Sequence, residues 1–328
     1  MQSIPDGRYV GTEMMDSNGI NDEPVHIEVA VEVEGSTVRV DYSNCPAAQQ
    51  GPINSPLPGT ISVSRIAIYS LVGAGGTPNE GSFRPVEVVT RPGTMFHPLP
   101  PAPCFLYAWP ELVATEAIYK SLAQALPDAI PASSAGDFCI VAWWGMRELG
   151  YPWGDGIVTG IGIGASSKGD GCTGQSIVVS GTRKPPVEVW EAKNPWLFDW
   201  IEIAQDSCGP GKHQGGSGVN TRVHILEDSV MTNTTEHTKT RPAGLFGGES
   251  ARSNSAALQP PGGEMTEIPK LSAHPVAKGS VFELRSGGGG GYGPAAEREP
   301  EKVLQDIRDG YITEAFARKH YPQAFAAG

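Results

Sequence analysis

Charged residues are scarce in this sequence, and its basic residues form no run. Charged side chains make up 18% of the 328 residues, and 36 acidic against 24 basic residues give a formal net charge of −12. Binding to a phosphate backbone needs clustered Lys and Arg, so this balance argues against nucleic acid as a partner. Hydrophobic residues reach 39%, which is too apolar for a disordered chain. We therefore expect a globular protein.

Long apolar runs, paired cysteines and a leader-like start are also missing. No stretch of about 18 apolar residues predicts a membrane span, and the opening MQSIPDGRYVG lacks the charged and apolar regions of a signal peptide. The cysteines lie far apart without a C-x-x-C pair, which argues against a disulfide framework and a zinc ribbon. We expect a reduced, cytoplasmic protein with no metal ligands. The five cysteines are Cys45, Cys104, Cys139, Cys172 and Cys208.

Glycine and proline are abundant instead, at 42 and 29 residues. Residues 1–106 nevertheless contain strand patterns. Apolar residues alternate along His26–Val33 and Thr37–Tyr42, which predicts a hairpin with one buried face. TISVSRIAIYSLVG favours a helix with Thr60 as its N-cap, and Glu111–Leu126 shows a helical period that Pro127 ends. We assign residues 1–148 to a β-rich domain with two helices.

Residues 149–295 change in character. Glycine-dense segments alternate with short pieces expected to be extended, such as PVEVW (Pro186–Trp190) and VFEL (Val281–Leu284). We expect this region to be extended, polyproline-II-like backbone packed on the first domain. Residues 296–328 predict two short helices, the first with Pro300 near its start and the second capped by Thr313.

None of the glycine motifs predicts a nucleotide site. In GIGIGASSKG (Gly160–Gly169), Lys168 precedes the last glycine and Asp170 follows it. A phosphate loop needs Lys and Ser or Thr directly after the glycine, and a dinucleotide fingerprint needs a following helix. We therefore expect no cofactor bound by this chain.

Catalytic residues are not identified by any local pattern. The segment DSCGPGKHQGG offers Asp206 and His213 as candidates, the latter because it lies in a glycine-rich turn beside polar groups. Cys208 has no base near it in sequence and is expected to be a buried structural thiol. Tryptophans such as Trp143 and Trp144 are expected in core or interface packing.

In their order along the chain, these segments resemble the carboxy-terminal half of the hydantoinase B/5-oxoprolinase family, which includes the large subunits of acetone and acetophenone carboxylases. The resemblance runs nearly from end to end, and the shared order of the segments makes it specific. The segments that carry it include PDGRYVG, GPINSP, PNEGSFRPVEVVTRPGT, GIGIGASSKGDG, DSCGPGKHQGGSG, LFGGE and GGGGGYGPAAEREPEKVLQDIRDGYITEAFARKHY.

The resemblance implies a β-rich α+β fold, in which a barrel-like pair of sheets with a few helices runs into a glycine-rich bundle of polyproline-II-like segments. Such segments have no internal hydrogen bonds, so they bond laterally, and only glycine lets their backbones approach closely. We therefore expect structural glycines rather than a linker. They are Gly160, Gly162, Gly164, Gly288, Gly289 and Gly290.

The resemblance also implies a subunit of an ATP-dependent multi-subunit enzyme. Carboxylation of a ketone, of acetone or acetophenone type, is favoured; the alternatives are hydrolytic opening of a hydantoin, oxoproline or lactam ring, and a non-catalytic scaffold. ATP and a divalent metal are then expected on partners, namely a kinase-like subunit of hydantoinase A type and a chain that supplies the metal-bearing amino-terminal half. The isolated chain is expected to be inactive.

Overall fold

The computed structural model describes residues 3–72, 77–105, 108–136, 139–176 and 183–325. They form two compact units, one up to Ile130 and one from Pro131 onward, and each is described by itself. The expected division at residues 148 and 295 follows changes in composition and stays a prediction.

The first unit is built on a four-stranded sheet in the order β1 (Gly7–Met15), β2 (Val25–Glu34), β3 (Thr37–Asp41) and β4 (Val86–Val89). β1, β2 and β3 pair antiparallel, and β4 joins β3 in parallel. Ile27, Val29, Val31 and Val33 are all buried on one face of β2. The predicted hairpin is therefore confirmed.

Two long helices belong to this unit, α1 (Leu57–Val72) and α3 (Ala108–Leu122), with the short α2 (Glu80–Phe83) between them. α3 packs against β1 and β2. A side chain at Gly11 of β1 would collide with the Ala117 carbonyl of α3, so this glycine permits the close approach of helix and strand. Both predicted helices are confirmed, but Thr60 is not an N-cap: it lies inside α1, where its buried hydroxyl donates to the carbonyl of Phe96 (2.9 Å).

The second unit contains two antiparallel sheets that share one core. One has the order β11-β10-β13-β8-β7 and the other β12-β9-β5-β6. Trp143 and Met231 from the four-stranded sheet pack with Trp196, Val223 and Phe282 from the five-stranded sheet. The strands are β5 (Ile140–Met146), β6 (Pro152–Val158), β7 (Trp196–Ile203), β8 (Val219–Ile225), β9 (Ser229–Asn233), β10 (Ser255–Gln259), β11 (Thr266–Glu267), β12 (Leu271–Val276) and β13 (Val281–Arg285).

The β-rich α+β class is confirmed, but the barrel-like pair of sheets is wrong. None of the three sheets closes into a barrel within the described residues, since each ends in edge strands, such as β7 and β11. The segment PVEVW is also not extended. It begins α4 (Val187–Lys193), because Trp190 is drawn into the core and stacks on Phe198, and this packing overrides the strand preference of valine.

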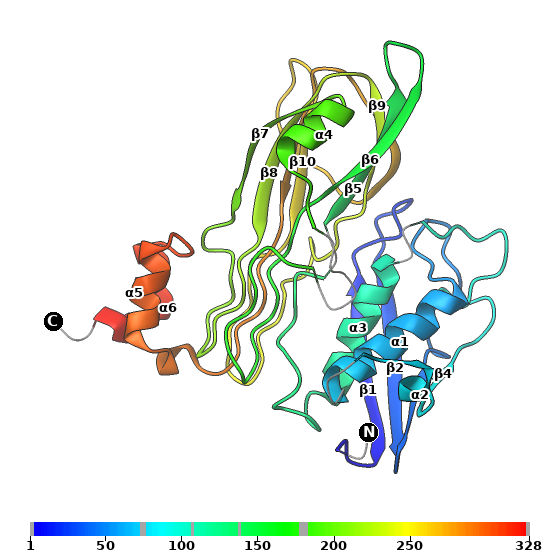
Figure 1. Cartoon of the computed structure of the whole chain (residues 1–328), viewed down its shortest axis with the longest axis vertical. Coiled ribbons are helices and arrows are strands. Elements are labelled where there is room, and N and C mark those ends of the chain that lie inside the picture. The colour runs from blue at the N-terminus through cyan, green and yellow to red at the C-terminus, as the bar shows by residue number, and fades with distance from the viewer. Residues whose placement is uncertain (1–2, 73–76, 106–107, 137–138, 177–182, 326–328) are drawn as a thin grey trace. The chain divides into compact units, whose positions relative to one another are not determined.

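Outside the sheets, glycine-rich segments lie next to each other and bond laterally. We call residues 160–165, 171–174, 207–218 and 286–292 the glycine layer. Its amides cross between segments, as in Gly162 N to Gly287 O (3.0 Å) and Gly289 N to Gly216 O (2.9 Å). Figure 1 shows these segments running side by side from the two packed sheets of the second unit towards the C-terminal helices. Their polyproline-II character stays a prediction.

The chain ends in a helical segment that packs on the glycine layer. It contains α5 (Pro300–Arg308) and α6 (Glu314–His320), with the 3₁₀ turns Ala295–Glu297 and Pro322–Phe325. Pro300 lies in the first turn of α5, and the Thr313 side chain accepts from Phe316 N (3.1 Å) at the start of α6, so both predicted helix starts are confirmed. Val303, Ile312 and Tyr321 bury their side chains around Cys208. No helix in the described ranges combines the length and apolar character that a bilayer span requires.

Candidate functional site

A polar cleft of about 900 Å³ lies within the second unit. We call it the cationic cleft. Three parts of the chain form its walls: the start of the 207–218 segment, the stretch from Arg241 to Ser253, and one face of α6. The residues that carry charge or could hydrogen-bond in it are Asp206, Arg241, Glu249, Ser250, Arg252, Ser253, Lys319 and His320.

Two arginines of the cleft are held in place by neutral acceptors. Arg241 donates from Nε to the carbonyl of Ala251 (2.8 Å) and from Nη2 to that of Ser250 (3.3 Å). Arg252 donates from Nη2 to Asn220 Oδ1 (3.0 Å) and to the carbonyl of Ser286 (2.9 Å). Burial, and then the nearby charge of Arg285, lower the pKa of Arg252. The structure thus keeps a positive charge in an environment that disfavours it.

Another wall of the cleft is formed by α6. Lys319 extends from it into the cleft, and His320 Nδ1 lies 3.0 Å from Glu249 Oε2. The His320 ring also packs on Phe316 at a centroid distance of 4.5 Å. α6 is positioned by its N-terminal cap, where Thr313 is bound by Asp206.

Asp206, one of the two residues proposed from the sequence, lines the cleft, and each of its carboxylate oxygens accepts a hydrogen bond from Thr313. Its Oδ1 accepts from Thr313 N (2.7 Å) and its Oδ2 from Thr313 Oγ1 (2.8 Å). Its backbone is left-handed, with φ of +60°, a conformation that Asp tolerates better than most residues. Through these contacts, Asp206 links the start of the 207–218 segment to α6.

His213, the other candidate, does not line the cleft. Its Nδ1 lies 4.0 Å from Oδ1 of Asp170. Asp170 in turn accepts from Nη1 (2.7 Å) and Nη2 (2.9 Å) of Arg298, whose side chain is only 1% exposed and also donates to Asp306 (2.8 Å). Burial opposes the charge of Asp170, but the hydrogen bonds and charge of Arg298 outweigh it and lower its pKa. The structure therefore brings His213 to an ion-pair network and not to Asp206.

Cys208 is buried in the wall of the cleft, as predicted from its surroundings in sequence. Burial raises the pKa of its thiol to about 12. A thiol with such a pKa is almost entirely protonated at neutral pH and is a poor nucleophile.

The six glycines proposed from the sequence all lie where another backbone segment passes close by. A Cβ atom at any of them would come within 3.0 Å of a backbone atom of a different segment. At Gly162 the obstructing atoms belong to Gly216, Gly288 and Gly289, and at Gly164 to Ala132. This region is packed backbone.

Three buried ionisable groups, at two places in the fold, carry no local signal in the sequence. Glu236 and Lys270 form an ion pair with almost no exposure, and nothing local announces it because the partners are 34 positions apart. In the first unit, burial raises the pKa of Glu111 to about 7, and the hydroxyl of Ser55 donates to it (3.1 Å). A carboxyl with a pKa near neutrality is a candidate general acid or base. Its position in the first turn of a helix resembles that of an ordinary surface glutamate, so no local pattern distinguishes it.

A metal site does not emerge from the geometry of the described residues. No group of three or more His, Cys, Asp or Glu side chains among them is arranged to hold a metal ion. The ligands and cofactors expected on partner chains stay a prediction.

The profile of the hydantoinase B/oxoprolinase family matches residues 1–295, so the chain belongs to this family. A protein of Pseudomonas sp. (strain NS671), named as the B-type subunit of a D-/L-hydantoinase, is 30% identical over 98% of this chain and 56% of its own length. Among solved structures, nucleotide-free acetone carboxylase matches with a TM-score of 0.81 at 18% identity, over 97% of this chain and 49% of its own. The ATP-dependent caprolactamase of Pseudomonas jessenii matches with a TM-score of 0.77 at 24% identity, over 98% and 57%.

These matches confirm the family expected from the sequence motifs. The two solved structures, at less than 25% identity, establish the fold alone. The chain spans about half the length of the curated relatives it matches. The activity of those longer proteins is therefore considered below as a proposal.

Proposed function

We propose that this chain is one subunit of an ATP-dependent enzyme complex of the hydantoinase B type. The alignment with the hydantoinase relative carries this proposal, because that protein is named as a subunit and is 30% identical over 98% of this chain. The remaining functions, nucleotide binding among them, are assigned to partners: a kinase-like subunit and a polypeptide that supplies the metal-bearing half. The reducing cytoplasm suits the five cysteines, which form no disulfide in the part of the chain that the structure describes.

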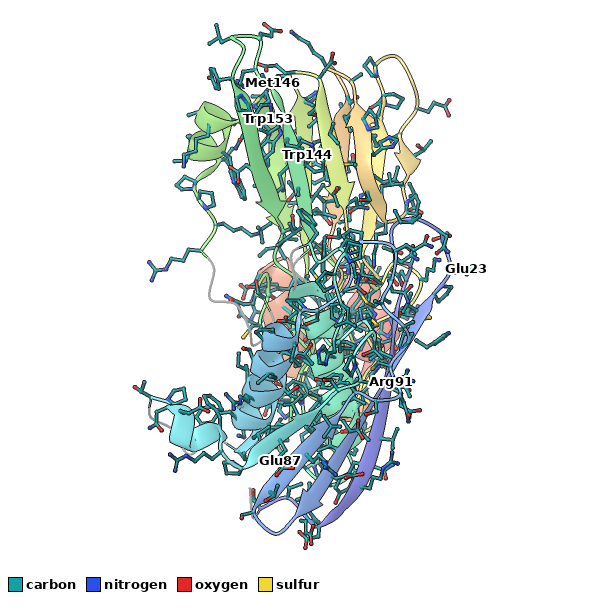
Figure 2. The ribbon with its side chains drawn as sticks, turned by 90° about the vertical axis from the view of Figure 1, so that its right-hand side faces the viewer. Glu23, Glu87, Arg91, Trp144, Met146 and Trp153 are labelled. Atoms are coloured by element: carbon teal, nitrogen blue, oxygen red, sulfur yellow. The ribbon has the colours of Figure 1, made fainter. Side chains whose placement is uncertain are left out.

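An apolar sheet face supports the role of a subunit. Figure 2 shows Trp144 and Met146 on β5. Both point away from the core, and they are 37% and 59% exposed. Trp144 lies beside Val230 of β9, and Val230 beside Pro275 of β12, so this row carries no charge. An antiparallel sheet usually presents polar residues to water, and an exposed apolar face indicates a protein partner.

For the reaction, we propose hydrolytic opening of a cyclic amide. The relative with 30% identity bears the name of a hydantoinase component, whereas acetone carboxylase shares the fold at 18% identity. In ring opening, the C–N bond of the amide breaks, the oxygen of water goes to the carbonyl carbon and a proton goes to the nitrogen. ATP hydrolysis would drive this step against the resonance that stabilises the amide.

Carboxylation of a ketone of acetone or acetophenone type is the second candidate. The sequence motifs favour it, through their resemblance to carboxylase subunits. ATP would then activate bicarbonate and ketone as phosphorylated species, which a site closed to water protects from hydrolysis.

The test is to express the chain with its candidate partners, isolate the assembly and assay it with ATP. One arm contains a hydantoin or ε-caprolactam, and the other contains acetone or acetophenone with labelled bicarbonate. We expect ATP-dependent appearance of the open-chain acid in the first arm. Incorporation of labelled bicarbonate into a ketoacid in the second arm would instead identify carboxylation as the reaction. An assembly with full activity in the absence of this chain would overturn both and leave the role of a scaffold.

A further inference from the structure

The cationic cleft has three positive side chains without an acidic partner. Arg241, Arg252 and Lys319 form no ion pair with the described residues, although acidic residues outnumber basic ones by 36 to 24 in the whole chain. In such a chain most arginines can find a carboxylate. Here both arginines are bound by carbonyl and amide oxygens instead, which orient the guanidinium groups without neutralising them.

The two carboxylates in the cleft form no ion pair with these three cations among the described residues. Asp206 is occupied by the backbone amide and hydroxyl of Thr313, and Glu249 by His320. Each carboxylate therefore has a partner on the α6 side. The three cations keep their remaining donors for whatever enters the cleft.

The donors are also preorganised. Arg252 uses only Nη2 in bonds to the described residues, so Nε and Nη1 remain available. A second cavity of about 460 Å³ adjoins, since Arg252 and Ser253 line both. Because a partly buried charge without a counter-ion is costly, an anion that pairs with Arg252 would recover part of that cost.

We propose that the cationic cleft binds a phosphoryl group, as a free phosphate or as part of a phosphorylated compound. Two guanidinium groups and one ammonium group, with the hydroxyl of Ser250 beside them, offer more charge and more donors than one carboxylate can use. A phosphate dianion, with three or four acceptor oxygens, matches them, and arginine binds it through paired N–H donors. For the origin of such a compound the proposal rests on the proposed function, since ATP-dependent activation produces phosphorylated species.

The experiment is calorimetric titration of inorganic phosphate into the full chain at low ionic strength, with acetate as the monoanion for comparison. We expect saturable binding of one phosphate and much weaker binding of acetate. Lys319→Gln and Arg252→Gln should each weaken phosphate binding by about tenfold, as expected for one charge-assisted contact. The matched control is Arg318→Gln, because Arg318 is the neighbour of Lys319 on α6 but pairs with Glu314 (2.6 Å) and does not line the cleft.

The outcomes separate clearly. Absence of saturable binding, equal affinity for acetate, or an equal loss in Arg318→Gln and Lys319→Gln would each overturn the proposal. Lys319 is exposed, so its variant keeps the test valid even where Arg252→Gln fails to fold. Methyl phosphate and ATP as competitors distinguish a small phosphorylated compound from a nucleotide, and displacement of phosphate by either one supports the phosphoryl site. Phosphate binding is measured on the isolated chain and does not depend on the complex. If the proposed function fails, the binding result still stands, and if phosphate does not bind, the proposed function is still open to its own test.

Discussion

Replacement of Gly289 by alanine is the sharpest test of the glycine layer. The new Cβ would lie less than 3.0 Å from the carbonyl carbon and oxygen of Ile163 and from the amide nitrogen of Gly164. These are backbone atoms, which cannot rotate away as a side chain can. One of the two segments must therefore move.

The movement disturbs hydrogen bonds on both sides. Gly289 N donates to Gly216 O (2.9 Å), Gly209 N donates to Gly289 O (2.8 Å), and Gly216 N donates to Ile163 O (2.9 Å). Overpacking costs about 1–3 kcal/mol, and weakening two such bonds adds about 1 kcal/mol each. Restriction of the unfolded chain returns less than about 1 kcal/mol. The net loss is roughly 2–5 kcal/mol, which lowers Tm on the order of 10 °C for a domain of this size.

Thermal melts of Gly289→Ala with and without ATP measure this effect. Gly156→Ala is the matched control, since its Cβ would lie at ordinary distances from Ile140 (3.7 Å) and Val141 (3.8 Å) in the same unit, and its Tm should change little. An unchanged or raised Tm in Gly289→Ala would refute the packed-layer reasoning and indicate a flexible linker. Loss of ATP binding with an unchanged Tm would indicate a phosphate cradle.

Three further predictions concern activity, metal and pH. The isolated, folded chain should show no ATPase, hydantoinase or carboxylase turnover in steady-state assays, and robust turnover would contradict its role as a subunit. Elemental analysis after chelation and dialysis should find far less than one transition metal per chain; about one zinc, manganese or iron would refute this. Burial raises the pKa of Glu111 from 4.5 to about 7, so the folded state holds a proton that the unfolded state releases. Stability should therefore fall as pH rises from about 4.5 to about 7, by on the order of 3 kcal/mol. Glu111→Gln should flatten this slope in chemical denaturation, and an equal slope in the variant would exclude Glu111 as the cause.

Local patterns in the sequence were sufficient for several elements. Alternation along β2 identifies the strand and its buried face, because one side faces the core along its whole length. The helical period of α3 identifies the helix but not a buried face, since residues 109–119 are buried on every side. The start of α6 could also be predicted, since an N-cap depends on the residues next to it. The strand preference of PVEVW was misleading, because burial of Trp190 stabilises a helix there.

The candidate site could not be predicted from local patterns in the sequence. Asp206 and His213 are seven positions apart, yet one lies in the cationic cleft and the other beside Asp170. Arg241 and Arg252 come from one stretch and Lys319 from α6, and the three share no motif. Arginines without acidic partners look the same in a sequence as arginines in ion pairs.

Residue order, alternation and composition were enough to establish the family, the mixed β-rich class and the existence of a glycine-dense region, because these are properties of the chain before it folds. Three features emerged only in the folded units: the sheets stay open, particular glycines face another backbone, and three cations share a cleft. Those features depend on the distance between segments far apart in the sequence, as for Gly162 and Gly289. Only packing of the whole unit sets such distances, through backbones that approach where no side chain intervenes.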